Sequence, residues 1–318
     1  AMADDYAVEP QKRALQLEAV AHISTQALID KGQDCQANPL SSEYTLWLHK
    51  EFCQLLPDEL LWIEKPETGQ KIKVIPGQLR TDEVRVGRHE PPFSVNLHSF
   101  LDRFDEAYDR QRLSRLRNVI AVAAAHHRFL WIHPFADGNG RVARLMSHAA
   151  LLHQNVGSPL WSVARGLARR VGDYKQLLMA ADERRQGDLD GRGTLSEKKL
   201  IAFCKFFLEI CIDQVEYMTD LIQPDKFERR LRLYVDEEIA AGQLPRGSFQ
   251  ILREVYLSGE VERGRVGEIT GYQERAARDL VTKLTHVGLL TSLAPRLPVR
   301  LAFPYAVTER LIPALYPV

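Results

Sequence analysis

Cysteine is scarce in this sequence, which has four among 318 residues, at Cys35, Cys53, Cys204 and Cys211. No two of them have the short spacing that is typical of zinc-binding sequences. Cys204 and Cys211 lie seven residues apart in an apolar stretch, so a helix there would place both on one buried side. We therefore expect reduced cysteines in a protein core, and no disulfide framework.

Long apolar runs are also missing, since no stretch approaches the roughly 20 residues that cross a bilayer. The N-terminal residues lack the apolar core of a signal peptide, so we expect a cytoplasmic protein without a membrane partner. Lysine and arginine together number 42, as do aspartate and glutamate, so the net charge indicates no class of partner. The length suits two domains or more.

Hydrophobic residues recur at helical spacing along the first three quarters of the chain. Leu113, Leu116 and Ile120, for example, form one stripe ahead of Pro134, which ends that helix. The pattern predicts helices over residues 9–31, 42–56, 96–108, 113–132, 138–152, 172–184, 196–221 and 225–242.

The segment 71–87 has a different character, because apolar and polar residues alternate on both sides of Pro76-Gly77. This pattern predicts a small β-hairpin. We thus predict three parts: an N-terminal helical segment over 1–70, an all-α catalytic core with a β-hairpin flap over 71–222, and a linker helix with a second domain over 223–318.

The second domain is predicted from a boundary at Gly242 and Pro245 and from the pattern that follows them. Helices are expected over 247–258, 263–269 and 272–287. Apolar residues then alternate around two prolines and indicate a β-wing; they are Leu290, Leu293, Val299 and Leu301, with Pro295 and Pro298. Three helices and a wing describe a winged helix-turn-helix domain.

Basic residues on this domain suit contacts with phosphate. They are Arg263, Arg265, Arg275, Arg278, Lys283, Arg296 and Arg300. DNA is therefore one candidate partner, through residues 245–303. The alternative use of such a domain is dimerisation or the docking of a target protein.

The chemistry of the chain is concentrated in residues 133–144, where a loop leads into a helix. Gly138 and Gly140 stand where the helix begins, and a helix start offers free backbone N–H groups and the positive end of the helix dipole to an anion. Arg141 and Arg144 are one turn apart, so their guanidinium groups lie on the same side. Asp137 supplies a carboxylate that suits Mg²⁺ between phosphate groups.

His133 lies at the other end of this loop. A neutral imidazole can accept the proton of a hydroxyl group near physiological pH. A phosphate cradle, cationic side chains and a base together indicate phosphoryl or nucleotidyl transfer.

The run from His133 to Arg144 resembles the signature of Fic-domain proteins, His-x-Phe-x-Asp/Glu-Gly-Asn-Gly-Arg-x-x-Arg, with every specified position filled. Residues 84–92 look like the flap of that family, and the downstream stretches 161–167, which begins with Trp161, and 174–188 look like its core. The resemblance covers about residues 70–215.

The resemblance implies a role for each matching residue. His133 would be the general base, Phe135 would anchor the loop, and Asp137 would bind Mg²⁺. The phosphate cradle and its surroundings would consist of Gly138, Asn139 and Gly140, with Arg141 toward the β-phosphate, Arg144 toward the γ-phosphate and Tyr174 as a weaker candidate near the adenine.

The usual reaction of the family is transfer of AMP from ATP to a serine, threonine or tyrosine hydroxyl of a protein substrate. Some relatives remove AMP, or transfer UMP, phosphate or phosphocholine, and the signature does not separate these. A de-AMPylase, or a DNA-binding regulator with a nucleotide-sensing core, are therefore the alternatives. Relatives often form dimers, so a homodimer is an expectation of the resemblance.

Many relatives also carry an inhibitory helix whose glutamate pairs with the second arginine of the signature. Glu18-Ala19-Val20-Ala21 resembles the residues that lead into such a helix, but no Glu-Gly or Glu-Asn follows. Asp30 is a poor substitute because its side chain is shorter. The hypothesis from the sequence is that inhibition within the chain is absent or degenerate.

Overall fold

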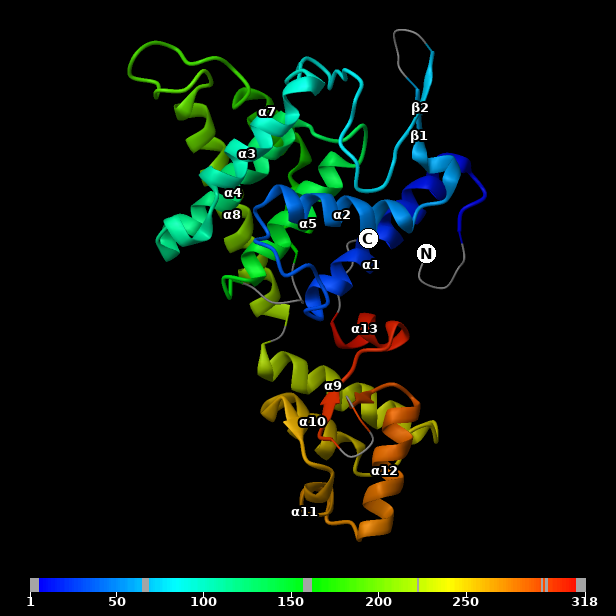
Figure 1. The fold of residues 1–318 in the computed structure, drawn as a ribbon. Helices are drawn as coiled ribbons and strands as arrows, with labels where there is room; N and C mark the ends of the chain where they lie inside the picture. The colour runs from blue at the N-terminus through cyan, green and yellow to red at the C-terminus, as the bar shows by residue number, and fades with distance from the viewer. Residues whose placement is uncertain are drawn as a thin grey trace. The chain divides into compact units, whose positions relative to one another are not determined.

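The computed structural model describes residues 6–64, 69–156, 162–221, 223–292, 294 and 297–312. The chain divides into two compact units, Ala1–Val215 and Glu216–Val318. The first unit is mostly helical, as predicted. Its described helices are α1 (Pro10–Asp30), α2 (Ser42–Gln54), α3 (Leu97–Ala107), α4 (Arg115–Ile132), α5 (Asn139–Leu152), α6 (Val163–Arg169), α7 (Val171–Ala180) and the first part of α8 (Glu197–Leu221), shown in Figure 1.

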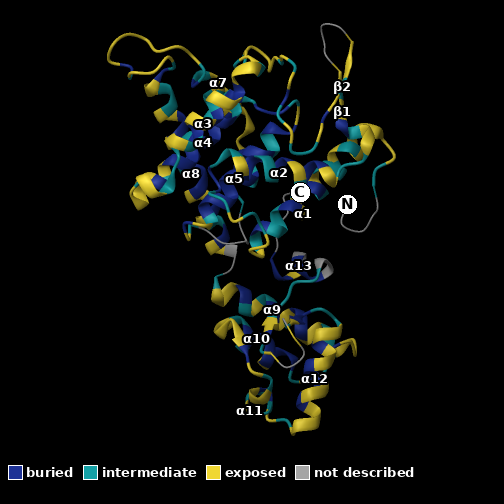
Figure 2. Ribbon diagram, in the orientation of Figure 1, coloured by how far each residue is buried: buried dark blue, intermediate teal, exposed yellow. Residues whose placement is uncertain are grey.

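Helix α5 forms the centre of the first unit. Nearly every residue from Val142 to Leu151 is buried (Figure 2), because α1, α2, α4 and α6 pack against it. A helix that is apolar or small-chained on all sides is stable only inside a protein. Helices α1 and α2, from the predicted N-terminal segment 1–70, therefore share one core with the predicted catalytic segment.

The ends of α4 and α5 that face the loop between them are set by local sequence. The hydroxyl of Ser114 accepts a hydrogen bond from the Arg117 backbone and caps the start of α4. Helix α4 ends where His133 adopts a left-handed conformation, with φ of 51°, and Pro134 cannot continue it. Helix α5 begins after Gly138, whose φ is 81°. The chain thus reverses direction within a short loop.

The hairpin lies earlier in the chain than predicted. Strand β1 (Trp62–Glu64) pairs antiparallel with β2 (Lys71–Lys73), with Ile63 opposite Ile72 (Figure 1). The prediction of a hairpin that turns at Pro76-Gly77 is wrong. The backbone N–H of Gly77 donates to His49 on α2 instead, so this turn fastens the chain to a helix rather than to a second strand.

The second unit contains helices at the positions that the sequence predicts. They are α9 (Pro224–Ala240), α10 (Ser248–Ser258), α11 (Val266–Thr270) and α12 (Glu274–His286), with α13 (Tyr305–Leu311) added. Strands β3 (Glu260–Val261), β4 (Leu290–Thr291) and β5 (Val299–Leu301) form a sheet in the order β3-β5-β4. Leu293, Pro295 and Arg296 of the predicted wing lie outside the described residues, and the winged-helix assignment stays a prediction.

Basic side chains of this unit are partly engaged with acidic ones. Arg278 forms an ion pair with Glu274, and Arg300 forms one with Glu260 at 2.7 Å. DNA binding through 245–303 also stays a prediction.

Two expectations from residue composition concern the interior and the membrane. Cys204 and Cys211 are buried on α8 as free thiols, as the sequence predicts. Among the described residues, no helix combines the length and the apolar character that a bilayer crossing requires.

Candidate functional site

Aromatic packing in the core holds the loop between α4 and α5 in place. The Phe135 side chain is fully buried, and its ring stacks on the imidazole of His49 with 3.9 Å between centroids and 5° between planes. Burying a phenylalanine stabilises a fold by roughly 2–3 kcal/mol. Phe135 therefore anchors the loop in the core, the role that its position in the signature implies.

Asn139 closes the loop into a ring. Its side-chain oxygen accepts the Phe135 backbone N–H at 3.0 Å, and its amide donates to the Phe135 carbonyl at 2.8 Å. The side chain of Asn139 is thus committed to the loop itself. The backbone N–H groups of Gly138, Asn139 and Gly140 donate to no described residue, so they are available to an anion at the start of α5.

Position 138 requires glycine for two reasons, its backbone conformation and the close approach of a neighbouring side chain. Its φ of 81° lies in the left-handed region, which side-chain-bearing residues seldom adopt. A Cβ atom at this position would also lie 3.3 Å from His49 Cδ2. The turn that presents the N–H groups therefore depends on glycine and on the histidine beneath it.

His49 joins three segments of the chain. Its Nδ1 accepts the Gly77 backbone N–H at 2.9 Å, so Nε2 carries the proton and donates to the Asp137 carbonyl at 3.2 Å. Burial lowers the pKa of His49 to about 4, which keeps this imidazole neutral and its two hydrogen bonds intact at neutral pH. Helix α2 thereby holds the flap segment and the loop in register.

Arg80 also connects the flap segment to the loop. It is 5% exposed, and its guanidinium donates to the carbonyls of His133 at 2.9 Å and of Pro92 at 2.5 Å. Its backbone N–H donates to the Pro134 carbonyl at 2.9 Å. Arg80 therefore connects both ends of the flap region to the residue that would act as base.

His133 is oriented by one hydrogen bond. Its Nδ1 faces the Leu130 carbonyl at 3.3 Å; because a carbonyl only accepts, Nδ1 carries the proton and Nε2 retains its lone pair. Burial lowers the pKa of His133 to about 4, and the hydrogen bond to Leu130 opposes that shift. The imidazole is therefore neutral at physiological pH and can accept a proton at Nε2.

The two arginines of the signature differ in their partners. The Arg141 guanidinium forms an ion pair with the carboxylate of Glu18 on α1. Arg144, by contrast, forms no hydrogen bond or ion pair with any residue that the structure describes, although burial lowers its pKa. A half-buried cation without a partner beside free N–H groups suits a phosphate oxygen.

Glu18 bears on the hypothesis about inhibition within the chain. Asp30 pairs with His148 at 2.7 Å, away from the signature arginines. Glu18, which the sequence analysis treated only as a flanking residue, occupies Arg141 instead. An acidic residue of α1 thus pairs with the first arginine of the signature, whereas the inhibitory glutamate of relatives would pair with the second. The hypothesis that inhibition within the chain is absent or degenerate stays a prediction.

Asp137 is the only carboxylate within the loop. Its side chain is 51% exposed and lies 4.0 Å from the Arg141 guanidinium. Among the described residues, no group of three or more histidine, cysteine, aspartate or glutamate side chains could hold a metal ion by itself. An exposed single carboxylate fits Mg²⁺, since that ion commonly takes one or two carboxylates and completes its shell with water and substrate phosphates.

Tyr174 on α7 lies in a buried relay. Its hydroxyl donates to His126 Nε2 at 2.9 Å, and His126 Nδ1 donates to Ser147 at 2.8 Å. Burial raises the pKa of Tyr174 to about 12 and lowers that of His126 to about 3. The polar atoms of this relay are satisfied within the core, and a role for Tyr174 beside an adenine stays a prediction.

Other residues of interest from the sequence lie away from the loop. Asp190 is buried and accepts from the Lys198 backbone and the Ser196 hydroxyl, so it fixes the start of α8. Asp182 accepts from His127 at 3.1 Å. Trp161, at the start of one stretch of the resemblance, lies outside the described residues.

Sequence reasoning missed His49, Arg80 and Glu18. His49 precedes the loop by more than 80 residues, and no local pattern marks it. Arg80 was hidden in the segment read as a hairpin. The Pro76-Gly77 pair shortly before it marked a turn, but no local pattern marked the contacts of Arg80 with the carbonyls of His133 and Pro92.

Comparisons with known proteins agree with the signature. The model of the Fic/DOC family matches residues 39–151, which include α2 to α4, nearly all of α5 and the loop between α4 and α5. The chain is 33% identical over 94 residues to "Protein adenylyltransferase Fic" of Drosophila erecta, which covers 30% of this chain and 19% of that protein. It is 31% identical over 126 residues to the protein of the same name from Culex quinquefasciatus, which covers 40% and 25%. The matched part thus spans about a fifth to a quarter of these relatives.

Solved structures with a similar arrangement are Fic proteins too. A Fic family protein from Desulfovibrio desulfuricans G20 has a TM-score of 0.48 at 16% identity and covers 95% of this chain and 79% of that one. A Fic domain-containing signaling protein from Bacteroides thetaiotaomicron VPI-5482 has a TM-score of 0.45 at 18% identity, with coverage of 68% and 75%.

Proposed function

We propose that this chain is a protein adenylyltransferase, which transfers AMP from ATP to a serine, threonine or tyrosine hydroxyl of another protein. One observation carries the proposal. The free N–H groups of 138–140, the unpaired Arg144 and the free Nε2 of His133 all belong to the loop and the first two turns of α5 that follow it. The curated relatives named protein adenylyltransferase support the choice of AMP as the transferred group.

Nucleotide binding would use the groups that the fold leaves without partners. The N–H groups at the start of α5 and the guanidinium of Arg144 would bind the β- and γ-phosphates. Asp137 would hold Mg²⁺, which, when bound, neutralises charge on the phosphates and the leaving pyrophosphate. Arg141 would join the phosphates after its ion pair with Glu18 opens.

The transfer step can be written in full with His133 as the general base. The hydroxyl oxygen of the target forms a bond to the α-phosphorus, and the bond from that phosphorus to the oxygen bridging the β-phosphate breaks. Pyrophosphate leaves with that electron pair. The hydroxyl proton passes to His133 Nε2 and is then released to water, while the Nδ1 hydrogen bond to the Leu130 carbonyl keeps the ring in place.

Labelled ATP tests the proposal directly. Wild type, His133→Ala and His98→Ala are incubated with ATP labelled at the α-phosphate, Mg²⁺ and a lysate as the source of targets. His98 is exposed on α3 and lies outside the loop, so its replacement is the matched control. We expect label on protein with wild type and His98→Ala, and a loss of at least about a hundredfold with His133→Ala, the lower end of a general base's contribution.

Two results would oppose the proposal. Label that persists in His133→Ala would remove the base from the mechanism. No label with wild type, together with release of AMP from an already modified protein, would assign the de-AMPylase reaction instead.

A further inference from the structure

A large basic pocket opens beside the catalytic loop, on a part of the surface that the signature residues do not line. It has a volume of about 1650 Å³, well above the roughly 300–1,000 Å³ of most small-molecule sites. Trp131 and Ile132, directly before His133, form part of its wall. The pocket is therefore large enough for a segment of polypeptide and adjoins the place where a substrate hydroxyl must arrive.

The charge in this pocket is one-sided although the whole chain has a net charge of zero. Seven cationic side chains line it against three acidic ones. The arginines come from the flap, from α3, from α4 and from the loop before α8; they are Arg88, Arg103, Arg128, Arg184, Arg185 and Arg192. Because four separate segments converge, the cluster is a product of the fold and not of one basic stretch.

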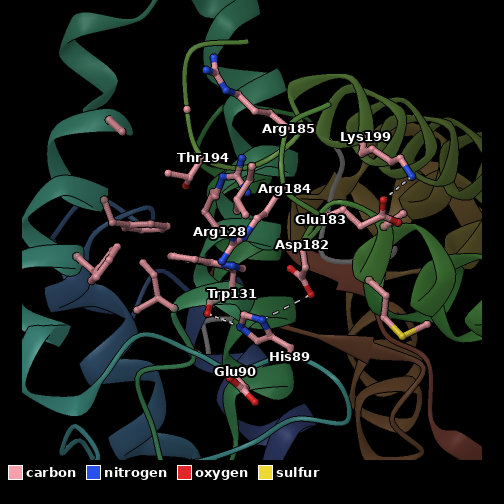
Figure 3. A pocket seen from close by; sticks show the side chains of 18 of the residues that line it. His89, Glu90, Arg128, Trp131, Asp182, Glu183, Arg184, Arg185, Thr194 and Lys199 are labelled. Atoms are coloured by element: carbon pink, nitrogen blue, oxygen red, sulfur yellow. Dashed lines mark hydrogen bonds and ion pairs between the residues drawn. The ribbon is translucent and has the colours of Figure 1, made fainter. Parts of the chain in front are cut away.

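The acidic side chains of the pocket are mostly engaged. Glu183 pairs with Lys199 at 2.9 Å, and Asp182 accepts from His127 at 3.1 Å. Figure 3 shows the arginines Arg128, Arg184 and Arg185 above the contact between His89 and Asp182. Among the cations, Lys199 pairs with Glu183 and Arg185 pairs with Asp188 at 3.8 Å, and the other five arginines form no ion pair with a residue that the structure describes.

Several arginines remain free. Arg88, Arg103, Arg184 and Arg192 have exposed side chains, and none of them forms an ion pair with a residue that the structure describes. A guanidinium group binds a carboxylate through two parallel hydrogen bonds. The free arginines of the pocket can therefore bind several carboxylates at once.

Aromatic side chains in the pocket are already packed against one another. The rings of Phe100 and Trp131 meet edge to face with 5.5 Å between centroids, and the centroids of His89 and Trp131 are 6.0 Å apart. Binding of a single-stranded nucleic acid relies on aromatic faces that are free to stack on bases. The packing therefore favours an acidic peptide over a nucleic acid.

The pocket is connected to the base through hydrogen bonds. His89 donates from Nε2 to the Trp131 carbonyl at 2.7 Å, and Trp131 lies two residues before His133. A peptide held in the pocket would therefore rest on the same short segment that positions the base.

We propose that this basic pocket binds an acidic segment of the protein substrate, so that the chain selects hydroxyl groups neighboured in its targets by aspartate and glutamate. The proposal rests on the proposed function for the statement that the bound peptide is a substrate. The binding itself does not depend on catalysis and is tested separately.

The binding test uses the full chain and three fluorescent probes. They are a short peptide with one serine among aspartate and glutamate, the same peptide with asparagine and glutamine in their place, and an oligothymidylate of equal charge. Each is titrated with wild type, with the double variant Arg184→Glu/Arg192→Glu and with Arg117→Glu. Arg117 is exposed near the start of α4 and lies outside the pocket, so it is the matched control for charge reversal.

We expect wild type to bind the acidic peptide at least about tenfold more tightly than the neutral one, with binding that weakens as salt is added. The double variant should lose at least about tenfold in affinity, whereas Arg117→Glu should stay within about twofold. Equal affinities of wild type and the double variant for the acidic peptide would overturn the proposal. Tighter binding of the oligothymidylate, with the same dependence on Arg184 and Arg192, would overturn it in favour of a nucleic acid.

A second measurement separates this proposal from the proposed function. Intact mass is recorded for both peptides after incubation with ATP and Mg²⁺, and we expect AMP on the acidic one. If the acidic peptide binds as expected but no protein or peptide ever gains AMP, the pocket stands and the proposed function fails. If proteins gain AMP while acidic-peptide binding ignores the double variant, the proposed function stands and the pocket proposal fails.

Discussion

The ion pair between Glu18 and Arg141 makes nucleotide affinity sensitive to a residue outside the signature. In the proposed function, Arg141 would have to release the carboxylate before it binds a phosphate, and we expect the cost of that release to weaken nucleotide binding. The side chains are 20% and 25% exposed, so solvent screens the pair only in part. A pair of this kind contributes roughly 1 kcal/mol, the upper end for exposed pairs.

Glu18→Gln removes the charge while it keeps the length of the side chain. A gain of about 1 kcal/mol corresponds to an affinity about fivefold higher, so we expect the Kd for ATP with Mg²⁺ to fall by about three- to fivefold. AMP lacks the β- and γ-phosphates that Arg141 would contact, so its Kd should change little. Titration calorimetry with both nucleotides, in the absence of a target protein, measures the two values.

The control is Glu9→Gln, which removes the partner of Lys12 at the exposed start of the same helix. It should leave both constants unchanged. If Glu18→Gln leaves the Kd for ATP unchanged, or raises it, then Glu18 does not compete with phosphate and the reasoning is refuted. An equal gain for AMP and ATP would likewise show that Arg141 does not contact the outer phosphates.

Three further predictions concern the loop. Gly138→Ala should lower the free energy of unfolding by about 1–2 kcal/mol in a urea titration, because of its positive φ and the close approach of His49. Gly140→Ala, where a Cβ atom would be at an ordinary contact distance from its neighbours, should not lower the free energy of unfolding in this way. Equal losses for the two variants would contradict the reasoning. His49→Phe keeps the stack on Phe135 but loses both hydrogen bonds, so it should lower the free energy of unfolding by about 1–3 kcal/mol in the same titration. His98→Phe is the control, and an equal free energy of unfolding for the two variants would exclude a positioning role for His49. Because the pKa of His133 is about 4 when folded and ordinarily 6.5, its contribution to stability is full above about 6.5 and declines as pH falls to about 4. Accordingly, kcat/KM should show no step near pH 6.5, and a step there that His133→Ala removes would refute the assignment.

The helices could be predicted from the sequence because burial follows a period that a single chain displays. The predicted helix over 113–132 corresponds to α4, which begins at Arg115 and ends at Ile132. Helix α6, seven residues long, was not predicted. The hairpin was misplaced because Pro76-Gly77 indicates a turn but not what the turn contacts. Only the fold determines that Gly77 donates a hydrogen bond to His49 and does not join two strands.

The loop itself could be predicted because its functional groups are neighbours in sequence. Gly138, Asp137 and His133 lie within six residues, so the roles expected of them could be argued from neighbouring residue types alone, and those roles stay predictions. The partners of the loop could not be predicted. Glu18 comes from α1 and His49 from α2, and their contacts exist only after both helices have packed against α5.

The supporting residues explain why the loop can be ready before a nucleotide arrives. Asn139 binds the Phe135 backbone, His49 binds the Asp137 carbonyl and Arg80 binds the His133 carbonyl. Each of these contacts uses a side chain or a carbonyl, and none uses the N–H groups at the start of α5. The fold therefore fixes the geometry of the cradle with groups that an anion does not need. In the proposed function, binding energy from the nucleotide would then not be consumed in ordering the loop. Among the described residues, Arg141 would have to exchange its contacts with the carboxylates of Glu18 and Asp137.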